Sequence, residues 1–288
     1  MSDVTEQARD LPLDSHLHTN LSPDSSVPID AYAERAVDQG IVEIAITDHV
    51  DFEPGAPAFE FATFETRERI VRDAAERWAP AGVAIRFGVE ITYDRRHEDD
   101  IRQHLARHRY DYVIGSVHVY ADSPFHPSRV ASWVAGRPLA EIVAPYFDEV
   151  GAAIRSGLFD TIGHLDFVKR YLHPLVTAAQ LAAAPELYEP LLVALVETGV
   201  SLEINTSGLR QAAAETYPSA AVVARYKVLG GTRVSAGSDA HTERAFSLGL
   251  EAGYRVAAAA GFGTFAFRRG GHRVDVDLPD RFRTPSHT

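Results

Sequence analysis

The sequence of 288 residues predicts an α/β fold with about seven strand–helix units. Short β-branched and apolar runs, typical of buried parallel strands, alternate with longer segments in which apolar residues recur at helical spacing. The segments between strands are long enough for right-handed crossovers. No repeat, linker or change of composition marks a second domain. We therefore expect one domain over residues 11–279, between an extended or disordered N-terminus (1–10) and a C-terminal tail (280–288).

The first half of the chain is expected to hold four strands and three helices. The first helix stops at Gly40, and the second stops at a Pro-Ala-Gly sequence that cannot continue a helix. His104 and His108, four residues apart on the polar third helix, are expected on a solvated face. The expected strands cover residues 11–18, 41–47, 83–89 and 110–117. The expected helices cover residues 28–40, 61–78 and 98–109.

The second half continues the alternation, with longer loops. Pro, Ser and Gly are frequent over residues 120–138, which we expect to be a loop, as we do residues 166–177 and 205–214. Pro145 is expected to kink its helix, and Pro185 and Pro190 to interrupt the next one. The expected strands cover residues 159–163, 200–204 and 232–236, with a final strand over 265–276. The expected helices cover residues 139–156, 178–198, a segment ending at 229, and 242–260.

Composition restricts the classes of function. A net charge of −12 argues against a general nucleic-acid or membrane-surface binder, because such proteins need a basic face. The chain has no cysteine, so any metal must be held by histidine and carboxylate. No signal sequence and no run of ~18 apolar residues is present, and we expect a cytoplasmic protein without membrane contact. The sequence does not indicate an oligomeric state.

Eight residues of metal-ligating type follow the predicted strands. In parallel α/β folds the carboxyl ends of the strands gather on one face, where barrel active sites are built. Each residue alone is weak evidence, but together they predict one metal centre. Imidazole and carboxylate ligands suit Zn, Mn or Fe, and a carboxylate that bridges two ions ~4 Å apart helps to form hydroxide at neutral pH. The eight residues are His16, His18, His49, Glu90, His118, His164, Asp239 and His241.

Six short motifs resemble the successive motifs of the PHP (polymerase and histidinol phosphatase) superfamily. They are Asp-Ser-His-Leu-His-Thr (14–19), Ile-Thr-Asp-His (46–49), Gly-Val-Glu (88–90), Gly-Ser-Val-His (115–118), Gly-His-Leu-Asp (163–166) and Ser-Asp-Ala-His (238–241). They span nearly the whole chain in the right order. Two further segments, Glu-Ile-Asn-Thr-Ser-Gly-Leu-Arg (203–210) and Phe-Val-Lys-Arg-Tyr (167–171), resemble the histidinol-phosphate phosphatase branch.

The resemblance implies a distorted (βα)7 TIM-like barrel with two to three divalent ions at the carboxyl ends of its strands. Asp24 is either a further ligand, where some relatives place a histidine, or a turn residue or cap before the next helix. The implied ligand sets are His16, His18, Glu90 and Asp239 for the first ion; Glu90, His118 and His164 for the second; and His49 and His241 for the third.

Candidate substrate and catalytic residues lie close to these motifs. Arg210 is the first choice to bind phosphate, because its planar guanidinium suits bidentate contacts. Arg170 and Lys169 come second, with a solvated loop as the alternative. Ser207 and Asn205 are candidate hydrogen-bond donors, although both are also common turn formers. The candidate catalytic carboxylates are Asp48, Glu90 and Asp239, where Asp48 either orients His49 or transfers a proton.

Taken together, the resemblance implies a metal-dependent phosphomonoesterase with a small phosphorylated substrate. The leading hypothesis is hydrolysis of L-histidinol phosphate to histidinol and phosphate, in histidine biosynthesis, by attack of metal-activated hydroxide. The first alternative is a PHP-type phosphoesterase acting on nucleotides, other small esters or nucleic-acid ends. A metal-binding PHP module without turnover is a second alternative. A binuclear amidohydrolase is a third, although Glu90 fills the position where such an enzyme ordinarily has a lysine.

Overall fold

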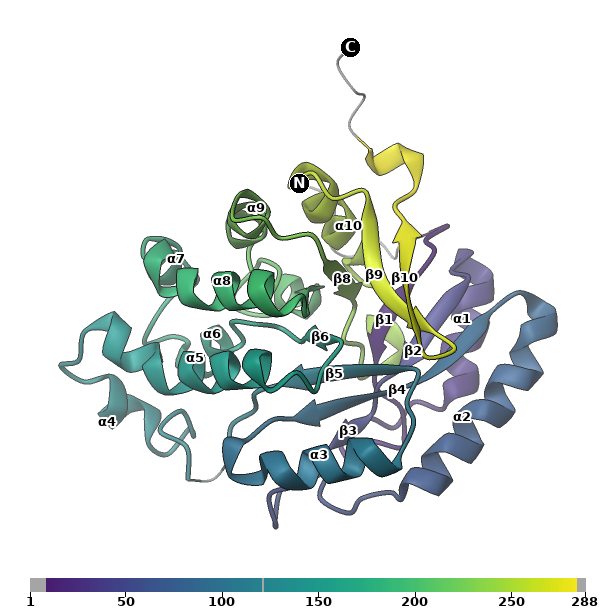
Figure 1. Cartoon of the computed structure of the whole chain (residues 1–288), viewed down its shortest axis with the longest axis horizontal. Coiled ribbons are helices and arrows are strands. Elements are labelled where there is room, and N and C mark those ends of the chain that lie inside the picture. Colours follow the sequence, from purple (N-terminus) through teal and green to yellow (C-terminus); the bar gives the residue numbers. More distant parts are fainter. Residues whose placement is uncertain (1–8, 121, 284–288) are drawn as a thin grey trace.

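A mostly parallel sheet that nearly closes into a barrel forms the centre of the computed structural model, which describes residues 9–120 and 122–283 (Figure 1). The strand order is β1-β2-β4-β5-β6-β7-β8, and the short β3 extends the sheet beside β4. The predicted α/β alternation and barrel are therefore confirmed. The strands are β1 (Asp14–Leu17), β2 (Glu43–Ile46), β3 (His49–Val50), β4 (Ala84–Thr92), β5 (Tyr112–Ser116), β6 (Thr161–Ile162), β7 (Ser201–Asn205) and β8 (Val234–Gly237).

The first and last strands of the barrel meet without a regular ladder. Two backbone hydrogen bonds cross this seam, from His18 N to Ala240 O (3.0 Å) and from Asp239 N to His16 O (2.8 Å). The Tyr32 hydroxyl lies beneath it, within hydrogen-bond distance of the carbonyls of both His18 (3.0 Å) and Ala240 (2.9 Å). The seam is thus held by a few contacts at the carboxyl ends of β1 and β8.

Helices surround the sheet (Figure 1). The left-handed Gly40 ends the first helix, with φ of 69°, and the Thr63 side chain caps the second by accepting a hydrogen bond from Thr66 N. The helices are α1 (Ile29–Gln39), α2 (Phe64–Trp78), α3 (Glu98–Arg107), α4 (Val130–Val134), α5 (Leu139–Ser156), α6 (Val168–Leu172), α7 (Ala178–Ala182), α8 (Glu189–Thr198), α9 (Ala220–Val228) and α10 (Leu250–Ala259). Single 3-10 turns cover Ala79–Ala81, Arg95–His97, Pro185–Leu187, Ser207–Arg210, Glu243–Ala245 and Asp280–Phe282.

Several elements differ from the predictions. The short helices α4 and α6 lie in segments that we expected to be loops. The helix expected over 242–260 begins only at Leu250, and α5 continues through Pro145. The final strand is instead a hairpin of β9 (Thr264–Arg269) and β10 (His272–Asp277), because Gly270 and Gly271 adopt positive φ values of 54° and 80° and form a tight turn.

The hairpin covers the amino-terminal end of the barrel. In Figure 1 it lies beside β8 and across the start of β5. Its Phe267 packs against Tyr112, the first residue of β5, and Arg269 pairs with Glu43, the first residue of β2. The barrel is therefore closed by side chains at this end, which leaves the carboxyl end for the site.

Two further predictions need correction. His104 and His108 are only partly exposed: His104 contacts the Tyr110 hydroxyl at 2.9 Å, and His108 stacks on Phe64. The segment expected to be a tail includes a 3-10 turn whose Phe282 is buried against Tyr254. The predictions for residues 1–8 and 284–288 lie outside the described residues. No helix in the described part of the chain is long and apolar enough to cross a membrane.

Candidate metal centre

Four side chains from three strands meet at the carboxyl end of the seam. His16 in β1 and His18, the residue after β1, are two positions apart and so point the same way, and their Nε2 atoms lie 3.0 Å apart. Both nitrogens lie 3.4 Å from Glu90 Oε2 of β4. Asp239 Oδ1, just after β8, lies 3.8 Å from His16 Nε2 and 3.4 Å from His18 Nε2. All four side chains are almost completely buried.

This arrangement fits a metal ion. Two ligands at a right angle on an ion with bonds of ~2.1 Å are themselves ~3.0 Å apart, which is the spacing of the two imidazole nitrogens. Glu90 Oε2 is buried and accepts no hydrogen bond of regular geometry from the described residues, although His49 Nδ1 lies 2.9 Å away and buried carboxylate oxygens ordinarily have a partner. A cation between these atoms would satisfy all four residues. Metal ligation by this set remains a proposal.

Glu203 of β7 orients His16. Its Oε1 accepts a hydrogen bond from His16 Nδ1 at 2.6 Å, which turns the Nε2 lone pair of the same ring toward the proposed ion. Its Oε2 accepts from His164 N (2.7 Å) and from Asn205 Nδ2 (3.1 Å). The motif analysis did not single out Glu203. The available signal was its position two residues before Asn205, on the strand face that points into the barrel.

A second group surrounds the other oxygen of Glu90. His164 Nε2 lies 2.9 Å from Glu90 Oε1, and His118 Nε2 lies 3.7 Å from it. His118 Nδ1 is 2.8 Å from the Thr92 hydroxyl, which fixes the ring, and Ser116 donates to Glu90 Oε1. This is the set expected for a second ion, with Glu90 as the bridge. His164 has an unusual positive φ of 23°, so the backbone is held in a strained conformation to place this ring.

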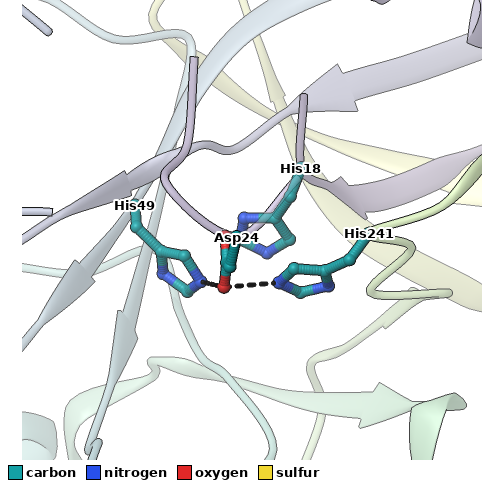
Figure 2. Close-up of side chains that lie close together, drawn as sticks. All are labelled: His18, Asp24, His49 and His241. Atoms are coloured by element: carbon teal, nitrogen blue, oxygen red, sulfur yellow. Dashed lines mark ion pairs between the residues drawn. The ribbon is translucent and has the colours of Figure 1, made fainter. Parts of the chain in front are cut away.

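The third group joins the loop after β1 to the ends of β3 and β8 (Figure 2). Asp24 Oδ2 lies 3.3 Å from His49 Nε2 and 3.1 Å from His241 Nε2. The ring of His18 packs against both of the other rings, with its centroid 4.2 Å from that of His49 and 4.1 Å from that of His241. Helix α1 has no side-chain cap, so the geometry favours the ligand role of Asp24 over the capping role.

The three groups share residues and so do not form three separate ligand sets. His49 Nδ1 lies 2.9 Å from Glu90 Oε2, and His18 falls within reach of the Asp24 group as well as of the His16 group. Asp239 has φ of 52°, a left-handed conformation that carries its carboxylate back toward the seam. One continuous ligand surface therefore runs from His164 to His241.

Charge in this cluster is complementary to cations. Burial acts to raise the pKa of Glu90, but His16 and His49 outweigh it and hold that pKa well below its usual value. Burial acts to lower the pKa of His16, but Glu203 and Glu90 outweigh it and raise that pKa. The Glu90 carboxylate thus remains ionised and favours positive charge on His16. Metal ions can supply the same charge directly.

A cavity of about 970 Å³ opens over the cluster. It is lined by candidate ligands such as Glu90 and His241, and by two of the predicted phosphate-binding residues, Arg170 and Arg210. Arg170 is exposed, lies over the ring of Phe167 at 5.2 Å, and forms no ion pair among the described residues. Arg210 instead donates to the backbone carbonyls of Ser238 (2.6 Å) and Asp239 (2.8 Å), so it braces the Asp239 turn.

Three other predicted roles do not match the geometry. Lys169 is buried and paired with Asp166 (2.6 Å) and Glu215, so its ammonium is not available to phosphate. Asn205 donates to Asp239 Oδ2 at 3.2 Å and accepts from the Ser207 hydroxyl, so both residues position the Asp239 carboxylate. Ser207 nevertheless lines the cavity.

Asp48 is the third residue whose predicted role does not match the geometry. Its two oxygens accept hydrogen bonds from Thr19 N (2.6 Å) and Thr19 Oγ1 (2.8 Å), which fixes the loop after β1. Both ring nitrogens of His49 face other carboxylates, Glu90 and Asp24, so Asp48 does not orient that ring. Asp48 is also absent from the cavity lining, and a direct role in proton transfer is not supported.

Fold and site together define the class of TIM-like barrels with a buried cluster of histidines and carboxylates at the carboxyl ends of the strands. The sequence model of the PHP domain matches residues 14–207, and the chain belongs to the PHP domain family. The predicted resemblance is thereby confirmed. The protein is 32% identical to a probable histidinol-phosphatase of Deinococcus radiodurans over 79% of this chain and 85% of that one.

Other relatives agree with this assignment. The histidinol-phosphatase of Lactococcus lactis subsp. lactis is 27% identical, over 87% of this chain and 91% of that protein. A crystal structure of histidinol phosphate phosphatase from the same organism, complexed with zinc, L-histidinol and phosphate, superposes with a TM-score of 0.79 at 24% identity, over 91% of this chain and 98% of the other. That superposition supports the same barrel fold.

Proposed function

We propose that the protein is a metal-dependent phosphomonoesterase that hydrolyses L-histidinol phosphate to histidinol and phosphate. The observation that carries this proposal is the joint presence of the buried ligand cluster and relatives named histidinol-phosphatase that match most of the chain. The reaction places the protein in histidine biosynthesis, and the substrate is a small phosphorylated molecule.

Two to three divalent ions are proposed as cofactors. The ligand chemistry suits zinc, manganese or iron. Zinc is the first ion to test, because the Lactococcus lactis phosphatase was crystallised with it. When bound, such ions supply Lewis acidity that makes a water nucleophilic at neutral pH and balances the charge of the phosphate. We assign the eight histidines and carboxylates predicted from the strand ends, together with Asp24, as the ligands.

The protein's own side chains then bind and orient the ester. The Arg170 guanidinium faces the cavity without an acidic partner among the described residues, and a planar guanidinium suits two phosphate oxygens at once. Ser207 is held by Asn205 at the same wall of the cavity. Arg210 adds positive charge there while its donors hold the Asp239 turn. We therefore place the phosphate between the ligand cluster and these residues.

The function is tested by phosphate release. Metal-replete protein is assayed with L-histidinol phosphate, with other monoesters that include glycerol phosphate and nucleoside monophosphates, and with a bis(aryl) phosphodiester. We expect a clear preference for L-histidinol phosphate in kcat/KM. A preference for nucleotides or for the diester would favour the alternative phosphoesterase, and metal binding without turnover of any ester would favour the non-catalytic module.

The ligand assignment has a separate test. His16→Ala and Glu90→Ala should each lose metal, measured by elemental analysis, and nearly all phosphatase activity, because each removes a ligand that the others cannot replace. His272→Ala, which changes an exposed histidine on β10, should keep both. Retention of metal and activity by either site variant would show that the centre lies elsewhere.

A further inference from the structure

One carboxylate in the cavity is not part of the ligand cluster. Four acidic residues line the cavity, and three of them, Asp24, Glu90 and Asp239, belong to the groups described above. The fourth is Asp51, which follows β3 and is partly buried. One of its oxygens, Oδ2, accepts a hydrogen bond from Ala58 N at 3.1 Å. The described residues offer no hydrogen bond or ion pair to its other oxygen.

Among the described residues, Asp51 accepts a hydrogen bond from Ala58 N but forms no ion pair. The buried Arg67 is the cation behind this loop, and its pKa is lowered by burial and raised first by Asp48, with Asp51 acting less strongly. The Asp51 carboxylate lines the same cavity as Glu90 and His118 of the second ligand group.

Positively and negatively charged side chains lie on different sides of the cavity. Arg170 and Arg210 come from the segments after β6 and β7, whereas Asp51 follows β3, which pairs with β4 on another side of the mouth. The ligand cluster lies between these sides. The rest of the lining includes the polar His126, His173 and Gln211, and a larger aromatic and apolar part with Tyr120, Phe125, Phe167, Tyr171, Pro57 and Ala58. A ligand with an anionic end, a planar ring and a cationic group matches this layout.

We propose that Asp51 binds the cationic amino group of the substrate's organic half, and that this contact makes the site selective for phosphate monoesters of amino alcohols. The inference rests on the proposed phosphatase function and adds the basis of its selectivity. A charge-assisted hydrogen bond to a carboxylate that is already ordered by Ala58 strengthens binding without a large ordering cost. Esters without an ammonium group leave Asp51 unpaired and are bound less well.

The test compares two substrates that differ only in the amino group. They are L-histidinol phosphate and its desamino analogue, 3-(imidazol-4-yl)propyl phosphate. Wild-type protein is expected to prefer the first by about 10- to 100-fold in kcat/KM, the range for a hydrogen bond between charged groups. Asp51→Asn keeps the acceptor for Ala58 N and removes the charge, so it should lose most of this preference.

Glu53→Gln is the matched control. It removes one negative charge from the same loop, but Glu53 pairs with Arg96 (3.1 Å) and His97 (3.0 Å) and does not line the cavity, so the preference should stay at the wild-type value. The proposal is overturned if Asp51→Asn keeps the wild-type preference, or if it slows both substrates equally, which would indicate a structural role. A wild-type protein that hydrolyses both esters equally well also overturns it. Hydrolysis of neither ester would instead refute the phosphatase function.

Discussion

At the scale of single residues, Glu203 helps to hold the ligand cluster in place although it does not line the cavity. It is fully buried and accepts from a ring nitrogen of His16, a backbone amide and the Asn205 side chain. Such carboxylates fix the tautomer and direction of a metal-ligating imidazole. The same residue therefore connects β1, the end of β6 and β7 at the centre.

We expect Glu203→Gln to lower metal affinity by about 10- to 100-fold, because the neutral amide no longer stabilises the proton on His16 Nδ1. Competition with a chromogenic chelator measures the affinity. Glu189→Gln, which changes a carboxylate paired with Arg225 on the surface, is the control. Unchanged affinity in the Glu203 variant would contradict the orienting role.

At the scale of secondary-structure elements, the short helix α6 carries the proposed phosphate contact. Arg170 is exposed at the cavity, while its neighbour Lys169 points inward between Asp166 and Glu215. Burial acts to lower the pKa of Lys169, but Asp166 outweighs it and raises that pKa, so the ammonium persists. Tyr188, the residue before α8, also donates to Asp166 Oδ2 at 3.0 Å. This network holds α6 in place.

We expect Lys169→Met to destabilise the fold by about 3–5 kcal/mol, because it leaves two carboxylates without their buried partner. The displacement of α6 should also raise KM for the phosphate ester. Urea unfolding and steady-state kinetics measure the two effects. Lys227→Met provides the comparison, since Lys227 packs on Phe262 at the surface and should change neither quantity by much. A Lys169 variant as stable as the wild type would rule out the network.

The regular elements were predictable because their patterns are local. Each expected parallel strand contains the observed one, or overlaps it as β4, β7 and β8 do, and Gly40 and Pro138 lie next to helix ends as expected. The short helices and the hairpin were missed for different reasons. Helices of five residues have too few turns to show a periodicity. The Gly270-Gly271 turn was not recognised within a polar run.

The sequence predicted which ligand-type residues come together at the site, but not the hydrogen-bond and ion-pair partners of the neighbouring residues. Eight ligand-type side chains at strand ends converge as expected, because parallel strands carry their carboxyl ends to one face. The partners of Lys169, Asp48 and Asn205 come from distant segments, and no local pattern indicates them. The shared position of His18 between two groups also depends on how closely the strands approach one another.

At the scale of the whole molecule, we expect metal removal to destabilise the barrel. An ion that binds only the folded state at about 100 times its Kd contributes about 2.7 kcal/mol. Chelation should therefore lower Tm by about 5 °C or more, and added zinc should restore it. Differential scanning calorimetry with and without chelator gives the measurement. The same Tm for apo and loaded protein would mean that the cluster holds no ion in the folded state.

At the seam between β1 and β8, we expect metal binding and closure of the barrel to be thermodynamically coupled. The proposed ion would bind His16 and His18 from one side and Asp239 from the other, whereas the two strands share few backbone hydrogen bonds. Such coupling is reciprocal. If a bound ion favours the closed seam, then a change that favours the closed seam also raises the affinity for the ion. Tyr32, whose hydroxyl lies within hydrogen-bond distance of a carbonyl on each side of the seam, would thus affect metal affinity without contacting a ligand side chain.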